Sequence, residues 1–349
     1  MSSIELLMRR AHELAANGLG TVSPNPLVGC VIVKDDVIIG EGWHKIYGGP
    51  HAEVNAVASV ADQGKLKGST VIVNLEPCSH FGKTPPCADL LVSHHVGRVI
   101  ISNRDTNPLV SGKGIAKLRE AGIDVIEGVL ESEGRDLNKR FFTMMEKKRP
   151  YVILKWAQTE NGMIAGQKGD PRWISNAVSR QLVHRWRTEE DAVLVGYKTA
   201  LDDNPRLNSR EWIGRDPIRV VIDKQLALPR SLNVFDGSQR TVILNTLKND
   251  EQLNTSFVKL NEDGFVFNVL AHLYERRVQS LIIEGGAGTL TMFIESGLWD
   301  EARVFSAPIS FKSGLRAPSI DGKVSESTNL AGDRLTIHHN LIPTPTPFK

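Results

Sequence analysis

The stretch T-V-I-V-N-L-E-P-C-S-H-F-G-K-T-P-P-C, residues 70–87, decides the fold of the first half of this chain. Its beginning, Thr70 to Leu75, is rich in β-branched side chains and predicts a buried strand. Cys78 follows that strand, and Cys87 opens an expected helix that runs to Ser93. The second thiol therefore lies at a helix N-terminus, where the positive end of the helix dipole stabilises a thiolate.

An upstream H-A-E motif supplies the other groups of a zinc site. His51 and Glu53 lie in the first turn of an expected helix from His51 to Ala61. One imidazole and two thiolates (His51, Cys78, Cys87) fill three positions of a tetrahedron and leave the fourth to water, whose pKa zinc lowers to roughly 7. Glu53, which is not a ligand, is the expected catalytic residue that moves a proton from the water to leaving ammonia. H-x-E followed by P-C is typical of zinc deaminases.

Two alternatives to a deaminase site stay open. The second motif is not C-x-x-C, because the eight residues Ser79 to Pro86 separate the cysteines. A structural zinc site with four protein ligands, serving a binding module, would use the same residue types. A deaminase that acts on nucleic acid or on free nucleosides, with a non-catalytic C-terminal half, would carry the same motif.

Composition bounds the remaining classes. A chain of 349 residues is long for a single core and suggests two domains. The net charge of +2 gives no support for a large nucleic-acid footprint, so we expect no nucleic-acid partner. Three cysteines make no disulfide framework, and Cys30 lies in the apolar run Val28 to Val33, which predicts a buried core position. No transmembrane run and no signal peptide are recognisable, so a cytoplasmic enzyme is expected.

Helical and strand patterns alternate along the whole chain, which predicts an α/β fold with each sheet covered on both faces. Helices are expected at Ile4–Ala16, 51–61, 87–93, Gly114–Ala121, Asn176–Arg187 and Ala287–Ser296. Strands are expected at Val28–Val33, Val37–Gly40, 70–75, Arg98–Ser102, Tyr151–Ala157, Ala192–Val195, Ile218–Asp223, Thr241–Asn245 and Ser280–Glu284. The charged run Glu146 to Pro150 is interpreted as a linker between two domains.

The long loop between the cysteines resembles that of the bifunctional riboflavin-biosynthesis deaminase–reductases. Pro24-Asn25-Pro26-Leu27-Val28-Gly29, Gly42-Trp43-His44 and residues 105–114 (D-T-N-P-L-V-S-G-K-G) match the same family, with Thr106 in place of the usual proline. The resemblance implies a cytidine-deaminase-like α/β/α sandwich and a diaminopyrimidinone substrate that carries a ribosylamino 5-phosphate. The implied substrate contacts are Asn25, His44, His80, Lys83, Asp105 and Asn107. Gly114 and its helix could also offer backbone N–H groups to an anion.

The second half contains no G-x-G-x-x-G motif, so a Rossmann site is unsupported. A glycine cluster between a strand and a helix, Glu284 to Leu290, could instead approach a phosphate. Together with Trp173-Ile174-Ser175, Val195 to Thr199 and Asp202 to Leu207, it resembles the family's reductase domain. That resemblance implies a dihydrofolate-reductase-like fold and NADPH, with domains at 1–146 (zinc deaminase) and 147–349 (reductase).

The resemblance also implies the reductase contacts and the reaction. Hydride would pass to C1 of the ring-opened ribosylamine and give a ribitylamine. Asn161 and Pro171 replace the Asp and Ser that the family often has, which puts the substrate fit in doubt. Neither change removes a requirement of hydride transfer. A deaminase whose reductase half is inactive stays a separate alternative, and a homodimer or higher homo-oligomer is a family expectation. The expected NADPH contacts are Gln158, Trp173, Thr199, Asp203, Gly286, Ala287, Gly288, Thr289, Leu290, Thr291 and Met292. The expected substrate contacts are Lys155, Pro171, Arg187, Leu207, Arg210 and Glu284.

Overall fold

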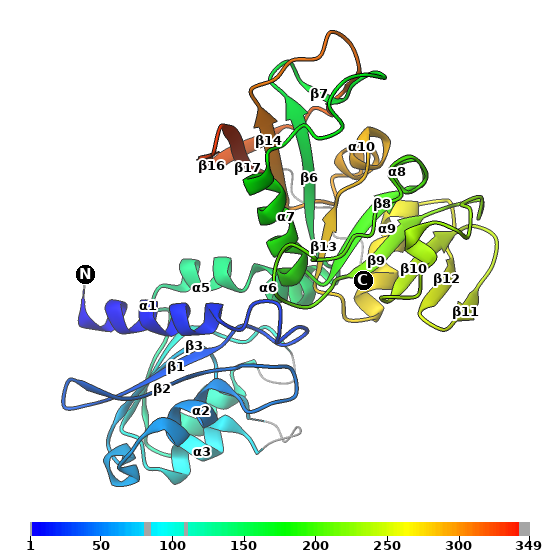
Figure 1. Ribbon diagram of the computed structural model, residues 1–349. Helices are drawn as coiled ribbons and strands as arrows, with labels where there is room; N and C mark the ends of the chain where they lie inside the picture. Colours follow the sequence, from blue (N-terminus) through cyan, green and yellow to red (C-terminus); the bar gives the residue numbers. More distant parts are fainter. Residues whose placement is uncertain (1, 80–84, 108–110, 342–349) are drawn as a thin grey trace. The chain divides into compact units, whose positions relative to one another are not determined.

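A computed structural model describes residues 2–79, 85–107 and 111–341 of the chain (Figure 1). The chain divides into two compact units, Met1–Glu146 and Lys147–Lys349, each with its own sheet and core. No helix in the described ranges is long and apolar enough to cross a membrane. His80 and Lys83 lie outside the described residues, as do Pro108 to Val110 of the second predicted loop.

Among the described residues, unit 1 has a five-stranded sheet in the order β2-β1-β3-β4-β5. β1 is antiparallel to both of its neighbours, and β3, β4 and β5 run parallel. The strands are β1 (Gly29–Lys34), β2 (Val37–Trp43), β3 (Thr70–Leu75), β4 (Arg98–Asn103) and β5 (Asp124–Ile126). The helices are α1 (Ser3–Ala16), α2 (Ala52–Ser59), η1 (Gln63–Leu66), α3 (Cys87–Ser93), α4 (Lys113–Glu120), α5 (Glu131–Leu137) and α6 (Lys139–Lys147).

The alternation of side chains along β1 and β3 gives this sheet two buried faces, because successive residues of a strand point to opposite sides. Cys30, Val71 and Val73 pack against α2, α3 and α4, which confirms Cys30 as a core residue. Val31 and Ile72 pack against α1 on the other face. The expected α/β/α sandwich is therefore confirmed, and α2 and α3 deliver the zinc motifs on the same face.

Unit 2 has, in the part of the chain that is described, a ten-stranded sheet in the order β11-β12-β10-β9-β8-β13-β6-β14-β17-β16. Its central strands from β12 to β14 are parallel, and antiparallel strands close both edges. The parallel strands are β6 (Tyr151–Thr159), β8 (Ala192–Gly196), β9 (Ile218–Ile222), β10 (Thr241–Asn245), β12 (Thr255–Lys259), β13 (Ser280–Ile283) and β14 (Glu301–Ala307). The antiparallel strands are β11 (Asp250–Gln252) at one edge, β16 (Gly322–Leu330) at the other edge, and β17 (Asp333–Asn340), which lies between β14 and β16. β7 (Met163–Ala165) and β15 (Leu315–Arg316) form a separate pair.

Helices cover both faces of the parallel region, as Figure 1 shows. α9 (Phe265–Glu275) and α10 (Ala287–Ser296) pack on the face formed by Val152 and Leu154. α7 (Ala177–Glu189) and α8 (Tyr197–Asp203) pack on the opposite face, formed by Ile153 and Val193, and η2 (Asn233–Phe235) lies beside them. The expected second α/β domain is confirmed.

The charged run at 146–150 is not a solvated linker throughout. α6 continues to Lys147, and the Arg149 side chain is only 1% exposed. The Arg149 guanidinium donates to both Asp300 oxygens, at 2.5 and 2.8 Å. Burial would raise the pKa of Asp300, but the charge of Arg149 outweighs burial and holds the pKa of Asp300 below its usual value. Sequence alone suggested solvent because five consecutive polar or proline residues form no apolar pattern, and the partner lies 151 residues away.

Candidate functional site

Three of the residues chosen from the sequence meet at one point in unit 1. The Nδ1 atom of His51 lies 3.6 Å from the Cys78 sulfur and 3.3 Å from the Cys87 sulfur, and all three ligand atoms lie within 4.8 Å of one another. Tetrahedral zinc with its usual Zn–N and Zn–S bonds separates such atoms by about 3.5 Å. The donor set and the spacing therefore fit zinc.

Local structure explains how the ligands converge. His51 is the N-cap of α2, Cys78 follows β3, and Cys87 is the first residue of α3. The backbone N–H of Cys87 donates to the Cys78 sulfur at 3.3 Å. The Cys87 thiol and the His51 ring lower the pKa of Cys78 to about 4, and the same Cys78 sulfur raises the pKa of Cys87. One sulfur is therefore stabilised as a thiolate by its neighbours.

Glu53 lies two residues after His51 in α2 and is only 3% exposed. Burial, followed by the Cys78 thiolate, raises the pKa of Glu53 to about 7, and its carboxyl contacts the Cys87 thiol. The close packing of α2 on β2 depends on Gly42, where an added Cβ would lie 2.3 Å from the Ala56 nitrogen. The G-W-H motif thus has a packing role beside its histidine.

Asn25 and His44 join the same site through one hydrogen-bond chain. His44 is 3% exposed, its Nδ1 lies 2.9 Å from the Pro50 carbonyl, and its Nε2 lies 3.0 Å from Asn25 Nδ2. A carbonyl can only accept, so Nδ1 carries the proton and Nε2 accepts from the Asn25 amide. Burial lowers the pKa of His44, consistent with this neutral tautomer. The His44 and His51 rings are 5.5 Å apart, so His44 borders the metal cluster, and Asn25 is hydrogen-bonded to His44.

Glu76, which the sequence analysis did not single out, organises the second loop. Its carboxylate is 4% exposed and accepts from four backbone amides, those of Asp105 (3.3 Å), Gly112 (3.0 Å), Gly114 (3.0 Å) and Ile115 (3.3 Å). The first amides of α4 are thereby occupied. The expectation that Gly114 and its helix offer N–H groups to an anion was wrong, because a carboxylate of the chain already holds them.

The predicted loop residue Asp105 is 8% exposed, and its Oδ1 accepts from the Asn107 N–H at 2.7 Å. Through Glu76 this turn is tied to the end of β3, two residues before Cys78. The sequence did offer one signal for Glu76, namely a carboxylate placed between an apolar strand and the Pro77-Cys78 motif. Its four partners lie 29 to 39 residues further on, however, so only the fold identifies them.

A second cluster of buried charges lies in unit 2 at the carboxyl ends of parallel strands, where ligands bind open α/β sheets. Glu284 follows β13, Lys155 lies on the neighbouring β6, and Arg187 comes from α7. Arg187 donates to both Glu284 oxygens at 2.7 and 2.8 Å, and Lys155 Nζ lies 3.7 Å from Glu284. These three predicted residues therefore form one ion-pair network.

The charges in this cluster are balanced by their neighbours. Burial would raise the pKa of Glu284, but Arg187 and Lys155 outweigh it and lower the value to about 2. Burial lowers the pKa of Lys155, partly opposed by Glu284. Arg187 also donates to the Asn208 carbonyl at 2.9 Å, so its guanidinium is largely committed within the protein. His184, which the sequence analysis missed, lies 3.0 Å from the same carbonyl through Nδ1.

The glycine cluster after β13 forms an open helix N-terminus, unlike α4. Gly286 is the N-cap of α10, and its N–H donates to Thr199 Oγ1 at 2.9 Å. No side chain in the described ranges accepts from the amides of Ala287 or Gly288. At Gly196, which ends β8, an added Cβ would lie 2.2 Å from Thr289 Oγ1, so this glycine lets α10 approach the sheet. The N-terminus of α10 thus fits a phosphate.

The other predicted reductase residues are divided between surface and core. Trp173 is 57% exposed and has Arg172 and Arg180 beside its ring, and Arg172 also reaches the Asp203 carbonyl at 3.4 Å. Pro171, Asp203 and Arg210 are exposed, Gln158 accepts from Trp156, and Thr291 and Met292 are half-buried. Leu207 and Leu290 are 2% and 0% exposed. Their side chains belong to the core, so only their backbone could face a ligand.

Comparison with known proteins gives matches over both units. The RibD C-terminal domain model matches residues 150–335, and the model of the cytidine and deoxycytidylate deaminase zinc-binding region matches residues 1–103. The riboflavin biosynthesis protein RibD of Aquifex aeolicus is 42% identical over 318 residues, which are 88% of each chain. The Escherichia coli protein of the same name is 37% identical over 331 residues, 89% of each chain.

Two solved structures are similar over nearly the whole chain. One is a diaminohydroxyphosphoribosylaminopyrimidine deaminase/5-amino-6-(5-phosphoribosylamino)uracil reductase from Thermotoga maritima, with 39% identity and a TM-score of 0.89 over 97% of this chain and 98% of that chain. The other is Acinetobacter baumannii RibD, with 33% identity and a TM-score of 0.89 over 97% and 99%.

Proposed function

The chain belongs to the RibD family of riboflavin-biosynthesis proteins, and on that premise we propose which residues perform its two reactions. It is a bifunctional enzyme, with a zinc-dependent deaminase and an NADPH-dependent reductase acting on small molecules. The domains proposed are 1–146 and 147–349, which the division of the chain into two compact units supports. A nucleic-acid deaminase with a non-catalytic second half is not favoured, because both halves match the family.

The deaminase substrate proposed is 2,5-diamino-6-(5-phosphoribosylamino)pyrimidin-4(3H)-one, and the carrying observation is the three-ligand cluster with Glu53 beside it. Zinc, when bound by His51, Cys78 and Cys87, makes water a nucleophile near neutral pH. Glu53 takes a proton from that water and gives it to the departing amino group at the 2-position. Asn25 and His44 are the groups proposed to hold the pyrimidine, since the His44 ring borders the cluster and Asn25 is hydrogen-bonded to His44.

The loop residues are proposed to bind the sugar phosphate end. Asp105 and Asn107 form a turn, and Glu76 holds this turn by accepting a hydrogen bond from the Asp105 N–H. With the α4 amides occupied, recognition of the phosphate falls to side chains, and His80 and Lys83 are the proposed groups. A lysine suits this task as a compact point charge.

Glu76→Gln is expected to raise the KM for the phosphorylated pyrimidine roughly tenfold while zinc stays bound. Glutamine keeps the size of the side chain, but its NH₂ group would face two backbone N–H groups and displace the loop or α4. Ammonia release measured against substrate concentration, together with zinc content, checks this. Glu120→Gln, at an exposed glutamate that ends α4, is the matched control. An unchanged KM in Glu76→Gln would contradict the role of the loop.

The reductase is proposed to act on 5-amino-6-(5-phosphoribosylamino)uracil and reduce its ribosyl group to ribityl. NADPH, when bound, supplies the hydride, and we propose that the N-terminus of α10 with Thr199 and Trp173 holds it. The other proposed contacts are Gln158, Asp203 and the loop 286–292. Lys155 Nζ, held by Glu284, donates a hydrogen bond to the ribose oxygen that gains a proton when the ring opens. Arg210, which is exposed, is proposed to bind the phosphate, and Arg187, held by Glu284, is proposed to border the substrate. Leu207 contributes its backbone, and Pro171 borders the substrate.

Lys155→Met is expected to lower NADPH oxidation by about 10²-fold and leave ammonia release unchanged. Methionine has nearly the length of the lysine side chain but lacks the ammonium group that donates to the ribose oxygen. The Arg187–Glu284 ion pair stays in place. Loss of NADPH absorbance on adding the deaminated intermediate measures the effect. Lys259→Met, at an exposed lysine that ends β12, is the control. A variant as fast as its parent would remove Lys155 from the reaction and leave the family assignment intact.

A cytoplasmic location and a homodimer or higher homo-oligomer are also proposed. The thiolate ligands suit a reducing compartment, and the three cysteines are free thiols in the structure. Light scattering on the purified chain tests the assembly, and a single monomer mass over a concentration series would overturn it.

A further inference from the structure

The segment that leaves α8 carries two residues in the left-handed region. Asn204, the C-cap of α8, has φ 43°, and Leu207 has φ 55°. Asparagine tolerates the left-handed conformation, whereas leucine rarely adopts it. Asn204 also precedes Pro205, which restricts the backbone conformations that Asn204 can adopt. Such backbone persists only where neighbouring structure holds it, and it gathers at functional sites. Asp203 and Leu207, both proposed ligand contacts, are the first and last residues of this segment.

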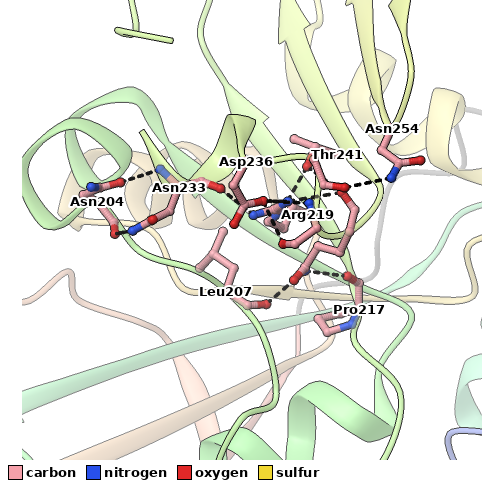
Figure 2. A network of polar contacts seen from close by, with 11 residues as sticks. Asn204, Leu207, Pro217, Arg219, Asn233, Asp236, Thr241 and Asn254 are labelled. Carbon is pink, nitrogen blue, oxygen red and sulfur yellow. Dashed lines mark hydrogen bonds and ion pairs between the residues drawn. The ribbon is translucent and has the colours of Figure 1, made fainter. Parts of the chain in front are cut away.

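Asn233 of η2 donates two hydrogen bonds to Asn204 (Figure 2). The Asn233 backbone N–H donates to Asn204 Oδ1 at 2.7 Å, and the Asn233 side-chain amide donates to the Asn204 carbonyl at 2.7 Å. The far end of the segment is held from the same side, since Gln239 Nε2 lies 3.4 Å from the Leu207 carbonyl and 3.0 Å from that of Pro217. Residues 233–239 therefore hold both ends of the loop from Asp203 to Leu207 by hydrogen bonds.

A buried arginine, Arg219, holds residues 233–239 in place, as Figure 2 shows. Arg219 on β9 is 0% exposed, and its Nε donates to Thr241 Oγ1 at 2.9 Å. Its Nη1 donates to the Asn233 carbonyl at 2.7 Å, and its Nη2 to Asp236 Oδ1 at 2.8 Å and the Gln239 carbonyl at 3.1 Å. One rigid guanidinium thus connects the sheet to both residues that hold the loop.

We infer that Arg219, Asn233 and Asn204 are positioning residues of the reductase, which fix the loop from Asp203 to Leu207 for NADPH and substrate. The inference rests on the proposed roles of Asp203 and Leu207. None of the three is among the proposed contacts to NADPH or substrate. Each acts through the backbone of the loop, because the hydrogen bonds run from Arg219 on β9 through Asn233 of η2 to Asn204, the C-cap of α8.

The test uses the full-length, zinc-loaded protein with Asn204→Gly and Asn233→Leu. Glycine keeps the left-handed backbone and removes the Oδ1 acceptor, whereas leucine removes the Nδ2 donor at similar size. Each variant is expected to raise the KM for NADPH or for 5-amino-6-(5-phosphoribosylamino)uracil roughly tenfold, with a smaller change in kcat. Ammonia release by the other unit should stay at the parental rate.

Asn254→Ala is the matched control, because Asn254 Nδ2 donates to the Gly237 carbonyl at 2.8 Å, on the side of the network away from the loop. Its KM values should equal those of the parent. Arg219→Lys should show the larger effect, and if it fails to fold the two asparagine variants still decide. Parental KM values in both asparagine variants, even with a lower unfolding midpoint, would overturn the inference. A parent chain without NADPH oxidation would instead overturn the reductase assignment itself.

Discussion

Glu53→Gln is expected to keep zinc bound and to slow ammonia release by roughly 10³-fold. Glu53 is buried beside the metal cluster and is not one of its three ligands, so the substitution leaves the metal site intact. Glutamine has nearly the same shape but cannot take a proton from water or return it to the leaving group. Ammonia release and zinc content, measured on the same preparation, give both quantities.

Glu13→Gln provides the control for Glu53→Gln, because Glu13 lies on the exposed side of α1 with 66% of its side chain exposed. It should match the parent in rate and in zinc. NADPH oxidation with supplied intermediate should be parental in both variants. Near-normal ammonia release from Glu53→Gln would remove Glu53 from the proton transfer, whereas loss of zinc would mean that its carboxylate supports the metal.

Cys87→Ser is expected to abolish both zinc retention and deamination, since one of three thiolate or imidazole ligands becomes a poor one. NADPH oxidation with supplied 5-amino-6-(5-phosphoribosylamino)uracil should be spared, because Lys155, Arg187 and Glu284 lie in the other compact unit. Metal analysis and the two separate assays measure these outcomes.

Cys30→Ala is the matched control for Cys87→Ser. Cys30 is wholly buried on β1 and is not part of the ligand cluster, so its removal should cost some stability but leave zinc in place. If Cys87→Ser loses both activities while its circular dichroism stays parental, the assignment of two independent sites is wrong. Full zinc retention by Cys87→Ser would remove Cys87 from the ligand set.

Much of the fold was predictable because its elements have regular local patterns. Thr70–Leu75, Cys87–Ser93, Thr241–Asn245 and Ala287–Ser296 have the predicted bounds, and the other predicted helices and strands differ at their ends by no more than a few residues. β-branched runs and apolar periodicity decide such elements within a few residues of sequence. Other elements were not predicted, among them the helices α5, α6, α8 and α9, the buried strands β12 and β14, and the strands β16 and β17. β16 is an exposed edge strand without a buried alternation, so its residues carry no such pattern.

By itself, the sequence determined the chemistry of the metal site and the family. An imidazole, two thiols and one carboxylate in the H-A-E and P-C contexts are a local property, and their residue types specify zinc and proton transfer. The match to both halves of the family follows from motifs spread along the chain in order. Spacing of this kind is visible without coordinates.

Only the tertiary structure decided which polar groups are already occupied. It showed that Glu76 fills the N-terminus of α4 whereas that of α10 stays open, and that Arg187 is committed to Glu284. It also revealed Arg219 as the residue that fixes the loop after α8. These partners are far apart in sequence, and a buried polar group must find a partner wherever the fold brings one within hydrogen-bond distance.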